Sequence, residues 1–349
     1  MKPNIVPTRT RRDSTDPEVR IAEMLSERIV GQQPAIDAIV PYVMMHQAGL
    51  SPDGRPAGVF LLLGPTGTGK TKTVEALADV LHGNARNVLR IDCGEYQLDH
   101  EVAKLIGAPP GYLGHRETHP LLTQQRLNGV TSDRSPISLV LFDEIEKAAP
   151  SMNRLLLGVL DKGVLRLGDN SSVNFFNSLI FMTSNLGARE MQRAVERGFG
   201  FSGLVPSGST ARRLDSIAIA AVRKRFTPEF VNRIDSSVTY HSLSREALEK
   251  ILELQLQELQ THIFNRLGPR GFRLDVTAGA RRALLDAGTS DQFGARQLKR
   301  VIHRNLTQPL ASMVAGGRIS PAGAVRASAG CKSLLHIAVL GKTAAEDAA

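Results

Sequence analysis

The chain has 349 residues, of which 42% are hydrophobic, so it is long enough to bury an apolar core and to form more than one domain. Its two cysteines, Cys93 and Cys331, argue against a disulfide framework or a metal cluster. No apolar run resembles a membrane span or a signal peptide. A cytoplasmic protein without a membrane partner is therefore expected. The formal net charge of +9 could attract nucleic acid, but four Tyr and no Trp provide little surface for base stacking. The preferred interpretation is that the positive charge is solvated, so no nucleic-acid partner is expected.

The amino-terminal part is predicted to be an arm that leads into a helix. Residues 1–24 are polar and contain proline, and part of the basic excess lies in Arg9–Arg12. A flexible basic arm is therefore expected over residues 1–24. The segment Ile29–Gln32 follows, and a helix is predicted from about Pro34.

Short apolar runs alternate with helical patterns between residues 25 and 240. This alternation predicts a large α/β domain with a doubly wound parallel sheet and helices on both of its faces. Strands are expected at residues 59–63, 88–91, 139–142 and 179–182. The segment 200–210 is rich in Gly, Ser and Pro, and is expected to be a loop.

The first of these strands is followed by the sequence GPTGTGKT and then by good helix-forming residues. This pattern between a strand and a helix is typical of a P-loop, and a chance glycine-rich turn is the alternative. Backbone N–H groups of such a loop surround phosphate, Lys70 reaches the β and γ oxygens, and the Thr71 hydroxyl is a ligand for Mg²⁺. The sequence therefore predicts binding of ATP and Mg²⁺ by Gly64, Pro65, Thr66, Gly67, Thr68, Gly69, Lys70 and Thr71.

Two acids, Asp143 and Glu144, directly follow the apolar run at residues 139–142. An unbroken apolar run of this kind is typical of a strand buried on both faces, so the acids are expected at the carboxyl end of the sheet. In P-loop ATPases, such acids hold Mg²⁺ and polarise the attacking water. Asp143 is predicted to bind the metal and Glu144 to act as general base; capping of the next helix is the alternative.

The pattern changes after Ser244, where apolar residues recur on one stripe of a long predicted helix that stops before Gly268. A strand at 272–276, helices at 277–287 and 296–314, and a last strand at 334–340 are expected to follow. Residues 241–342 are therefore predicted to form a small, mostly helical α+β domain, and residues 343–349 a frayed tail.

Five motifs occur in an order and spacing that resemble the Clp-type AAA+ unfoldases: the P-loop, LVLFDEIEKA, FMTSN, TPEFVNRID and FGARQLKR. In particular, residues 27–319 resemble the second ATPase module of ClpA, ClpB and ClpC. The resemblance implies a P-loop AAA+ fold with a C-terminal lid domain, ATP hydrolysis in a homo-oligomeric, hexameric ring, and unfolded or aggregated protein clients. No adaptor domain, first ATPase module or coiled-coil arm is present in the sequence, so a single-ring form is expected.

The resemblance also implies roles for five further residues. Asn185 matches the sensor-1 position, which orients the attacking water. Arg233 matches the arginine finger, which reaches the γ-phosphate bound by a neighbouring subunit, and Arg296 matches the sensor-2 residue of the lid, which contacts the nucleotide. Ile29 and Val30 match a segment that contacts adenine. The alternatives are a strand-end turn for the asparagine, surface salt bridges for the arginines, and core packing for the apolar pair.

A segment rich in glycine and proline, Gly107–Gly114, surrounds a lone aromatic residue, Tyr112. In the family, the matching loop lines the central pore, so the resemblance implies that Tyr112 and Leu113 grip the polypeptide; packing of the tyrosine within its own subunit is the alternative. A weaker signal for a second pore-facing loop lies at Arg166–Asp169. The sequence departs from the family at His115–Pro120, which leaves the grip and substrate preference open.

A last motif, Gly198–Phe201, lies where family members that feed a ClpP-type protease carry a docking loop. Phe199 and Phe201 are therefore candidates for contact with a ClpP-like peptidase, and packing on their own domain is the alternative. Taken together, the motifs predict an ATP-dependent protein unfoldase or disaggregase that threads polypeptide through a pore. A nucleic-acid remodelling ATPase and a scaffold that uses ATP only to assemble are the alternatives.

Overall fold

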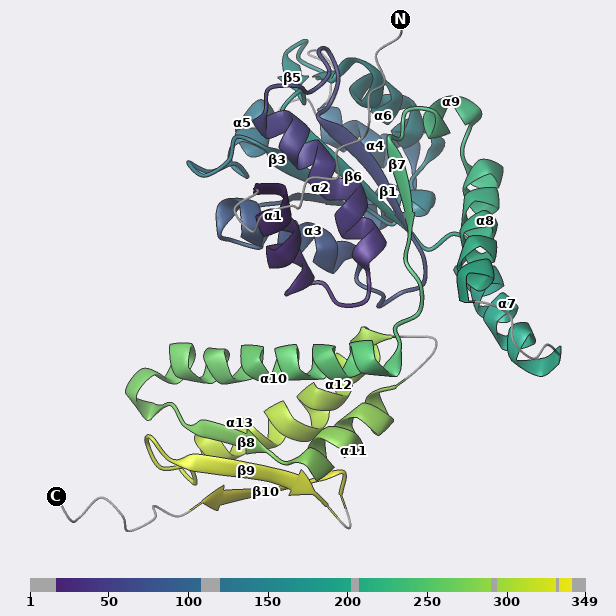
Figure 1. Ribbon diagram of the computed structural model, residues 1–349. Helices are drawn as coiled ribbons and strands as arrows, with labels where there is room; N and C mark the ends of the chain where they lie inside the picture. Colours follow the sequence, from purple (N-terminus) through teal and green to yellow (C-terminus); the bar gives the residue numbers. More distant parts are fainter. Residues whose placement is uncertain (1–16, 108–119, 202–206, 290–293, 331–332, 341–349) are drawn as a thin grey trace, which may run out of the picture. The chain divides into compact units, whose positions relative to one another are not determined.

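The computed structural model describes residues 17–107, 120–201, 207–289, 294–330 and 333–340 (Figure 1). These residues form two compact units. The first contains the described residues of Met1–Gly64 and Lys70–Tyr240, and the second contains Pro65–Gly69 together with the described residues of His241–Ala349. Among the described residues, no helix is both long and apolar enough to cross a membrane.

A five-stranded parallel sheet is the centre of the first unit, with the strand order β2-β3-β6-β1-β7. The strands are β1 (Gly58–Leu63), β2 (Leu89–Asp92), β3 (Ser138–Asp143), β6 (Ser178–Ser184) and β7 (Ser236–Thr239). Every residue of β1, β3 and β6 is buried, as the apolar runs in the sequence predicted. The parallel sheet expected for this part of the chain is therefore confirmed.

Helices cover both faces of the sheet because successive side chains of a strand point to opposite faces. Val59, Leu61 and Leu63 pack into one apolar core, and Phe60 and Leu62 pack into another. The second core is completed by α1 (Pro17–Ser26), α2 (Gln33–Gln47) and α3 (Lys70–His82). The first is completed by α4 (Asp99–Ile106), α5 (Gln124–Asn128), α6 (Pro150–Lys162), α7 (Ala188–Phe201), α8 (Ser207–Arg225) and α9 (Pro228–Val231).

Two smaller features complete the first unit. A hairpin of β4 (Val164–Arg166) and β5 (Ser172–Asn174) follows α6, and short 3₁₀ turns at Cys93–Glu95 and Ile145–Lys147 follow β2 and β3. Figure 1 shows α8 beside the edge strand β7.

Two expectations for the first unit are wrong in part. Residues 17–24 belong to helix α1 rather than to an arm, because Leu25 is buried and partly buried Ile21 and Ala22 pack against the core under α2. Helices extend into both ends of the segment 200–210, which was expected to be a loop, because α7 continues to Phe201 and α8 begins at Ser207. The remainder of each expected segment, residues 1–16 and 202–206, lies outside the described residues.

The second unit combines helices with a three-stranded sheet. Its helices are α10 (Arg245–Leu267), α11 (Ala278–Gly288), α12 (Ala295–Ile302) and α13 (Gln308–Ala315), and its strands are β8 (Arg273–Val276), β9 (Ala324–Ala329) and β10 (Leu335–Leu340). A 3₁₀ turn at Gly268–Arg270 ends α10, and a π-helical stretch at His303–Thr307 joins α12 to α13. The sheet order is β10-β9-β8, with β8 parallel and β10 antiparallel to β9. This mostly helical α+β fold agrees with the expectation from the sequence.

Candidate nucleotide-binding site

The predicted P-loop leaves the carboxyl end of β1 and leads into α3, which begins at Lys70. Gly64, the first residue of the loop, has φ +137°, and a Cβ atom there would lie 2.3 Å from the carbonyl oxygen of Tyr240. Only glycine fits this backbone and this space. The conformation of this turn is therefore set by Tyr240, which follows β7 in the same chain, as well as by the sequence of the turn itself.

The tip of the loop, Pro65–Gly69, belongs to the second unit. The Thr68 hydroxyl donates to the carbonyl of Pro65 at 2.9 Å, and the carbonyl of Gly67 accepts a hydrogen bond from the Ala295 N–H at 3.1 Å. Gly294 has φ +47°, and a Cβ atom there would lie 2.8 Å from the Gly67 carbonyl oxygen. This explains in physical terms why a glycine precedes the Ala-Arg pair of the FGAR motif.

Three predicted site residues from three separate elements meet through their side chains. The Lys70 Nζ donates to the carbonyl of Gly64 at 2.7 Å and to the Asn185 Oδ1 at 3.0 Å. The Asn185 Nδ2 in turn donates to the Glu144 Oε1 at 3.2 Å. The structure thus joins the P-loop lysine, the residue after β6 and the acid after β3 in one chain of hydrogen bonds.

Glu144 occupies an uncommon backbone conformation, with φ 56° and ψ 50° in the left-handed region. Its second carboxylate oxygen forms an ion pair with Lys147, and this hydrogen bond raises the pKa of the lysine. Glu146 accepts the Asn185 backbone N–H at 3.0 Å. The turn after β3 therefore fixes both the backbone and the carboxylate of Glu144.

Asp143 has two partners that the sequence did not indicate. Its carboxylate accepts hydrogen bonds from Arg90 of β2 and from the hydroxyl of Thr183 of β6. Arg90 and Thr183 lie on the strands that flank β3, so they reach Asp143 only because of the strand order. No local pattern in the sequence indicates either residue, because their positions depend on the register of the sheet.

The predicted metal ligands have suitable chemistry for Mg²⁺. The carboxylate of Asp143, 8% exposed, and the hydroxyl of the partly buried Thr71 are hard oxygen donors. Within the described part of the chain, no group of three or more His, Cys, Asp or Glu side chains could hold a metal ion. One carboxylate and one hydroxyl are the kind of ligands that Mg²⁺ takes when phosphate and water oxygens supply the rest.

Cys93 lies beside these acids at the end of β2 and is buried. Burial raises the pKa of its thiol, and the negative charges of Asp92, Asp143 and other nearby acids raise it further. The side chain therefore stays a neutral, apolar part of the core rather than a reactive thiolate.

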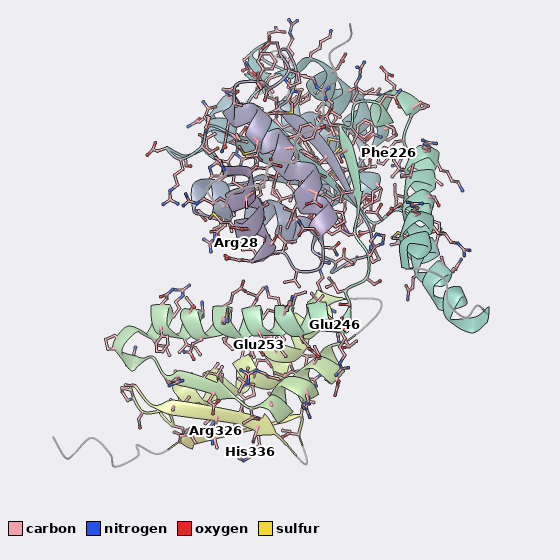
Figure 2. All side chains as sticks on the ribbon, viewed as in Figure 1. Arg28, Phe226, Glu246, Glu253, Arg326 and His336 are labelled. Carbon is pink, nitrogen blue, oxygen red and sulfur yellow. The ribbon has the colours of Figure 1, made fainter. Side chains whose placement is uncertain are left out.

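The segment proposed to contact adenine is anchored to the first unit. Ile29 is 6% exposed and packs in the core of α1, α2 and α3, whereas Val30 is only partly buried. Arg28, labelled in Figure 2, donates to the Asp79 carboxylate of α3 at 2.8 Å. Core packing thus accounts for the position of Ile29, and contact with adenine stays a prediction for both residues.

Arg233 lies away from the P-loop of its own chain. Two residues later, Asp235 is bonded to Val59 at the amino end of β1. Its backbone N–H donates to the carbonyl of Val59 at 2.9 Å, and its carboxylate accepts the N–H of Val59 at 2.8 Å. The P-loop leaves β1 at Gly64, five residues and about 16 Å further along the strand. Arg233 instead forms an ion pair with Asp161 of α6 at 2.8 Å. Its segment is held by the stacked rings of Phe226, labelled in Figure 2, and Phe230.

The other predicted positions are placed as follows. Arg296 is an exposed residue in the first turn of α12, in the second unit. Tyr112 and Leu113 lie outside the described residues. Phe199 and Phe201 are in the last turn of helix α7, so the loop expected around them is wrong: helix α7 carries the backbone through this Gly-Phe-Gly-Phe motif.

The proposed second pore-facing loop, Arg166–Asp169, begins at the last residue of β4 and continues into the turn of the β4–β5 hairpin. Leu167 is buried, and the Asp169 carboxylate accepts the Ser171 N–H at 2.9 Å. The Gly168 N–H donates at 2.8 Å to the carbonyl of Ile106, the last residue of α4. This turn is therefore bonded to the chain immediately before the segment that contains Tyr112.

Two family models match the chain. The AAA domain (Cdc48 subfamily) matches residues 55–237, and the C-terminal, D2-small domain of ClpB protein matches residues 243–327. The two matches correspond to the α/β part and to the helical part with the three-stranded sheet.

Curated relatives agree with these models. The chain is 39% identical over 292 residues to the chaperone protein ClpB of Rhodopirellula baltica, which covers 84% of this chain and 31% of that protein. It is 41% identical over 295 residues to the ATP-dependent protease ATP-binding subunit-like protein AmiB of Pseudomonas aeruginosa, which covers 83% of this chain and 78% of that protein. The chain thus spans less than a third of this ClpB but most of AmiB.

Solved structures of Hsp104 have the same fold. The closed state of Hsp104 with ATPγS and FITC casein superposes with a TM-score of 0.77 and 31% identity, over 93% of this chain and 52% of that chain. The extended conformation of the Saccharomyces cerevisiae Hsp104:casein complex gives a TM-score of 0.77 and 29% identity, over 93% of this chain and 53% of that chain. The chain therefore belongs to the AAA domain (Cdc48 subfamily) family, as a Clp-type AAA+ module with a ClpB-type D2-small domain.

Proposed function

We propose that this protein is an ATP-dependent protein unfoldase or disaggregase of the Clp type. The observation that carries the proposal is the hydrogen-bonded chain of Lys70, Asn185 and Glu144, because it links the P-loop to a candidate general base through a polar amide. A scaffold that only binds ATP has no need of this arrangement. The names of the relatives support the proposal: ClpB is a chaperone, both Hsp104 structures contain casein, and one of them also contains ATPγS.

Each residue of the site has a defined task in the proposed reaction. Lys70 would donate hydrogen bonds to the β- and γ-phosphate oxygens, and Thr71 and Asp143 would hold Mg²⁺. Asn185 would orient a water molecule in line with the γ-phosphate. The Glu144 carboxylate would take a proton from that water as its oxygen attacks the γ-phosphorus, and the bond from phosphorus to the β–γ bridging oxygen would break to release ADP and phosphate. Bound Mg²⁺ would neutralise charge on the phosphate oxygens.

The position of Arg233 supports action on a neighbouring subunit. The residue lies at the amino end of β1, whereas the P-loop leaves the carboxyl end, so its guanidinium does not reach the site of its own chain. Arg233 forms an ion pair with Asp161 in which the two side chains are 41% and 39% exposed. Its guanidinium could leave this exposed partner and bind the phosphate oxygens of a nucleotide held by another subunit. We therefore propose a homo-oligomeric ring, with six subunits as the expected number.

The clients would be unfolded or aggregated polypeptides, gripped by Tyr112 and Leu113. The hairpin turn bonded to the end of α4 would move together with this segment. Arg296 would contact the nucleotide from the lid domain, and the two cysteines of the chain favour a reducing, cytoplasmic compartment.

Coupling to a ClpP-like peptidase is a second, separable proposal. It is supported by the name of AmiB, an ATP-binding subunit-like protein of an ATP-dependent protease. Phe199 and Phe201 remain the candidate contacts, now on the last turn of α7 rather than on a loop. Unchanged capture of a ClpP-like peptidase by the double variant Phe199→Ala, Phe201→Ala would remove this proposal.

The experiment that tests the main proposal is ATP-dependent unfolding of a tagged fluorescent protein, with ATPase rate measured in the same samples. Wild type is expected to unfold the client, and Tyr112→Ala to lose unfolding while retaining ATP hydrolysis. A wild type that hydrolyses ATP but unfolds neither this client nor an aggregate would contradict the threading activity and leave the nucleic-acid and scaffold alternatives to be tested.

A further inference from the structure

One buried hydroxyl lies between the two catalytic candidates. Thr183, the sixth residue of β6, is 1% exposed. Its Oγ1 accepts the backbone N–H of Glu144 at 3.0 Å and donates its proton to the Asp143 Oδ1. Because the amide N–H can only donate, the hydroxyl oxygen must accept that bond. The single hydroxyl proton is then donated to the Asp143 carboxylate.

The sheet register places Thr183 there. β3 and β6 are parallel, and the last pair in their register is Phe142 with Met182. Asp143 and Thr183 therefore follow as neighbours at the carboxyl ends of the two strands. Glu144 comes one residue later, in the left-handed conformation that turns its N–H toward the hydroxyl.

The bond to Thr183 also selects one oxygen of Asp143. With Oδ1 bound to the hydroxyl, Oδ2 is the oxygen that the Arg90 guanidinium contacts. The Arg90 side chain is 51% exposed, so its contact can be exchanged for a cation, whereas the buried hydroxyl stays in place.

We propose that Thr183 is a positioning residue that sets both acids: it presents the Asp143 Oδ2 to Mg²⁺ and holds the Glu144 backbone so that the carboxylate meets Asn185. This inference rests on the proposed ATPase function. The hydroxyl of Thr183 is bonded to both acids, so the residue acts through them.

The test compares Thr183→Val, which removes the hydroxyl at similar size, with Thr183→Ser, which retains it. A matched control is Ser178→Ala at the other end of β6, where the buried hydroxyl bonds to the hydroxyl of Ser138 on β3 at 2.8 Å. Binding of a fluorescent ADP analogue is measured in EDTA and over a Mg²⁺ titration, together with kcat, KM for ATP and melting temperature.

Thr183→Val is expected to bind the analogue in EDTA as wild type does, to lose about 10-fold or more of the affinity gained from Mg²⁺, and to lower kcat by about 10–100-fold. Thr183→Ser is expected to restore both quantities to within about threefold of wild type, because the hydroxyl is retained. Ser178→Ala is expected to lower the melting temperature without changing the Mg²⁺ dependence.

The proposal is overturned if Thr183→Val retains the Mg²⁺ dependence and kcat of wild type, or if Ser178→Ala changes the Mg²⁺ dependence equally. If the valine variant does not fold, Thr183→Ala is compared with Thr183→Ser by the same criteria. If wild type binds nucleotide but does not hydrolyse it, the ATPase proposal fails, and the Mg²⁺ dependence of binding still decides the role of Thr183.

Discussion

The two ends of the central sheet carry charged side chains in opposite settings. At the carboxyl end, Lys70 and Asp143 are each 8% exposed, and residues of other strands and loops hold them. At the amino end, Arg233 and Asp161 form an ion pair that is about two-fifths exposed. A buried polar network is costly to rearrange, whereas an exposed pair contributes little and exchanges readily. We infer that one end is a pre-formed site and the other a surface for a second subunit.

Removal of Arg233 is the largest expected effect, because the proposed function places this residue in the nucleotide site of a neighbouring subunit. Arg233→Ala is expected to lower kcat by roughly 10³-fold with little effect on nucleotide binding to the isolated subunit. Steady-state ATPase assays and fluorescent-nucleotide titrations measure the two quantities.

Mixing two inactive variants tests the action in trans. In rings assembled from Arg233→Ala and Glu144→Gln subunits, some interfaces combine an intact Glu144 with an intact Arg233 from the neighbour. Turnover is expected to reappear in the mixture. Mixed rings that stay as inactive as the separate variants, despite proven co-assembly, would argue against the arrangement.

Glu144→Gln tests the pre-formed site at the carboxyl end of the sheet. The amide is nearly the same size but cannot accept the proton of water, so turnover is expected to fall by about 10²-fold or more while ATP binding is retained. Single-turnover hydrolysis and equilibrium binding separate the two effects. Normal turnover in this variant would refute the assignment of Glu144 as general base.

Gly64→Ala tests how rigidly the buried end is built. An added Cβ atom would meet the Tyr240 carbonyl at 2.3 Å, so a loss of about 3 kcal/mol in unfolding free energy is expected. The matched control is Gly49→Ala, where φ is also positive, at +69°, but nothing lies within 4 Å of the added atom. The control is expected to cost about 1 kcal/mol, and equal losses in urea melts of the two variants would contradict the packing argument.

Asp161→Asn tests the exposed end and should have a small effect on stability. Loss of an exposed ion pair is expected to cost less than about 1 kcal/mol. Because the change frees Arg233 from its partner, turnover in the assembled protein should be unchanged or raised. A marked loss of turnover would show that Asp161 is needed to hold the arginine in place for its neighbour.

His82, at the end of α3, gives the smallest expected effect, a change in stability with pH. Burial lowers the pKa of His82, against an opposing backbone hydrogen bond at Ile137, so the folded state favours the neutral imidazole. Its contribution to stability is therefore present above about pH 6.5 and is lost as the pH falls below that value. Urea melts between pH 5 and pH 8 should show a weaker dependence in His82→Gln, and an unchanged dependence would assign the effect to another group.

Much of the fold was predictable because its signals are local. The apolar runs of β1, β3 and β6 are buried on both faces, and the stripe on α10 predicted a helix that does end before Gly268. Segments with weaker local signals were missed. β7 reads Ser-Ser-Val-Thr and buries only Val238, and β9 reads Ala-Val-Arg-Ala-Ser-Ala and buries only Val325 and Ala327, so neither shows the apolar run of a central strand.

Helix α1 and the end of α7 were also missed. The polar composition of α1 resembles a flexible segment, and its apolar residues gain burial only when α2 packs over them. The loop at the Gly-Phe-Gly-Phe motif was expected from the resemblance to the family's docking loop, yet the chain remains helical there, although glycine weakens a helix.

By itself, the sequence determined the P-loop, the acid pair after a buried strand and the asparagine after the next strand, because each depends on residues that are adjacent in the chain. Only the tertiary structure decided that Thr183 bridges Asp143 and Glu144, that Arg90 reaches Asp143, and that Arg233 lies at the opposite end of the sheet from its own P-loop. These contacts join strands far apart in the sequence. They depend on strand order and register, which are set by the packing of both apolar cores rather than by any short stretch of residues.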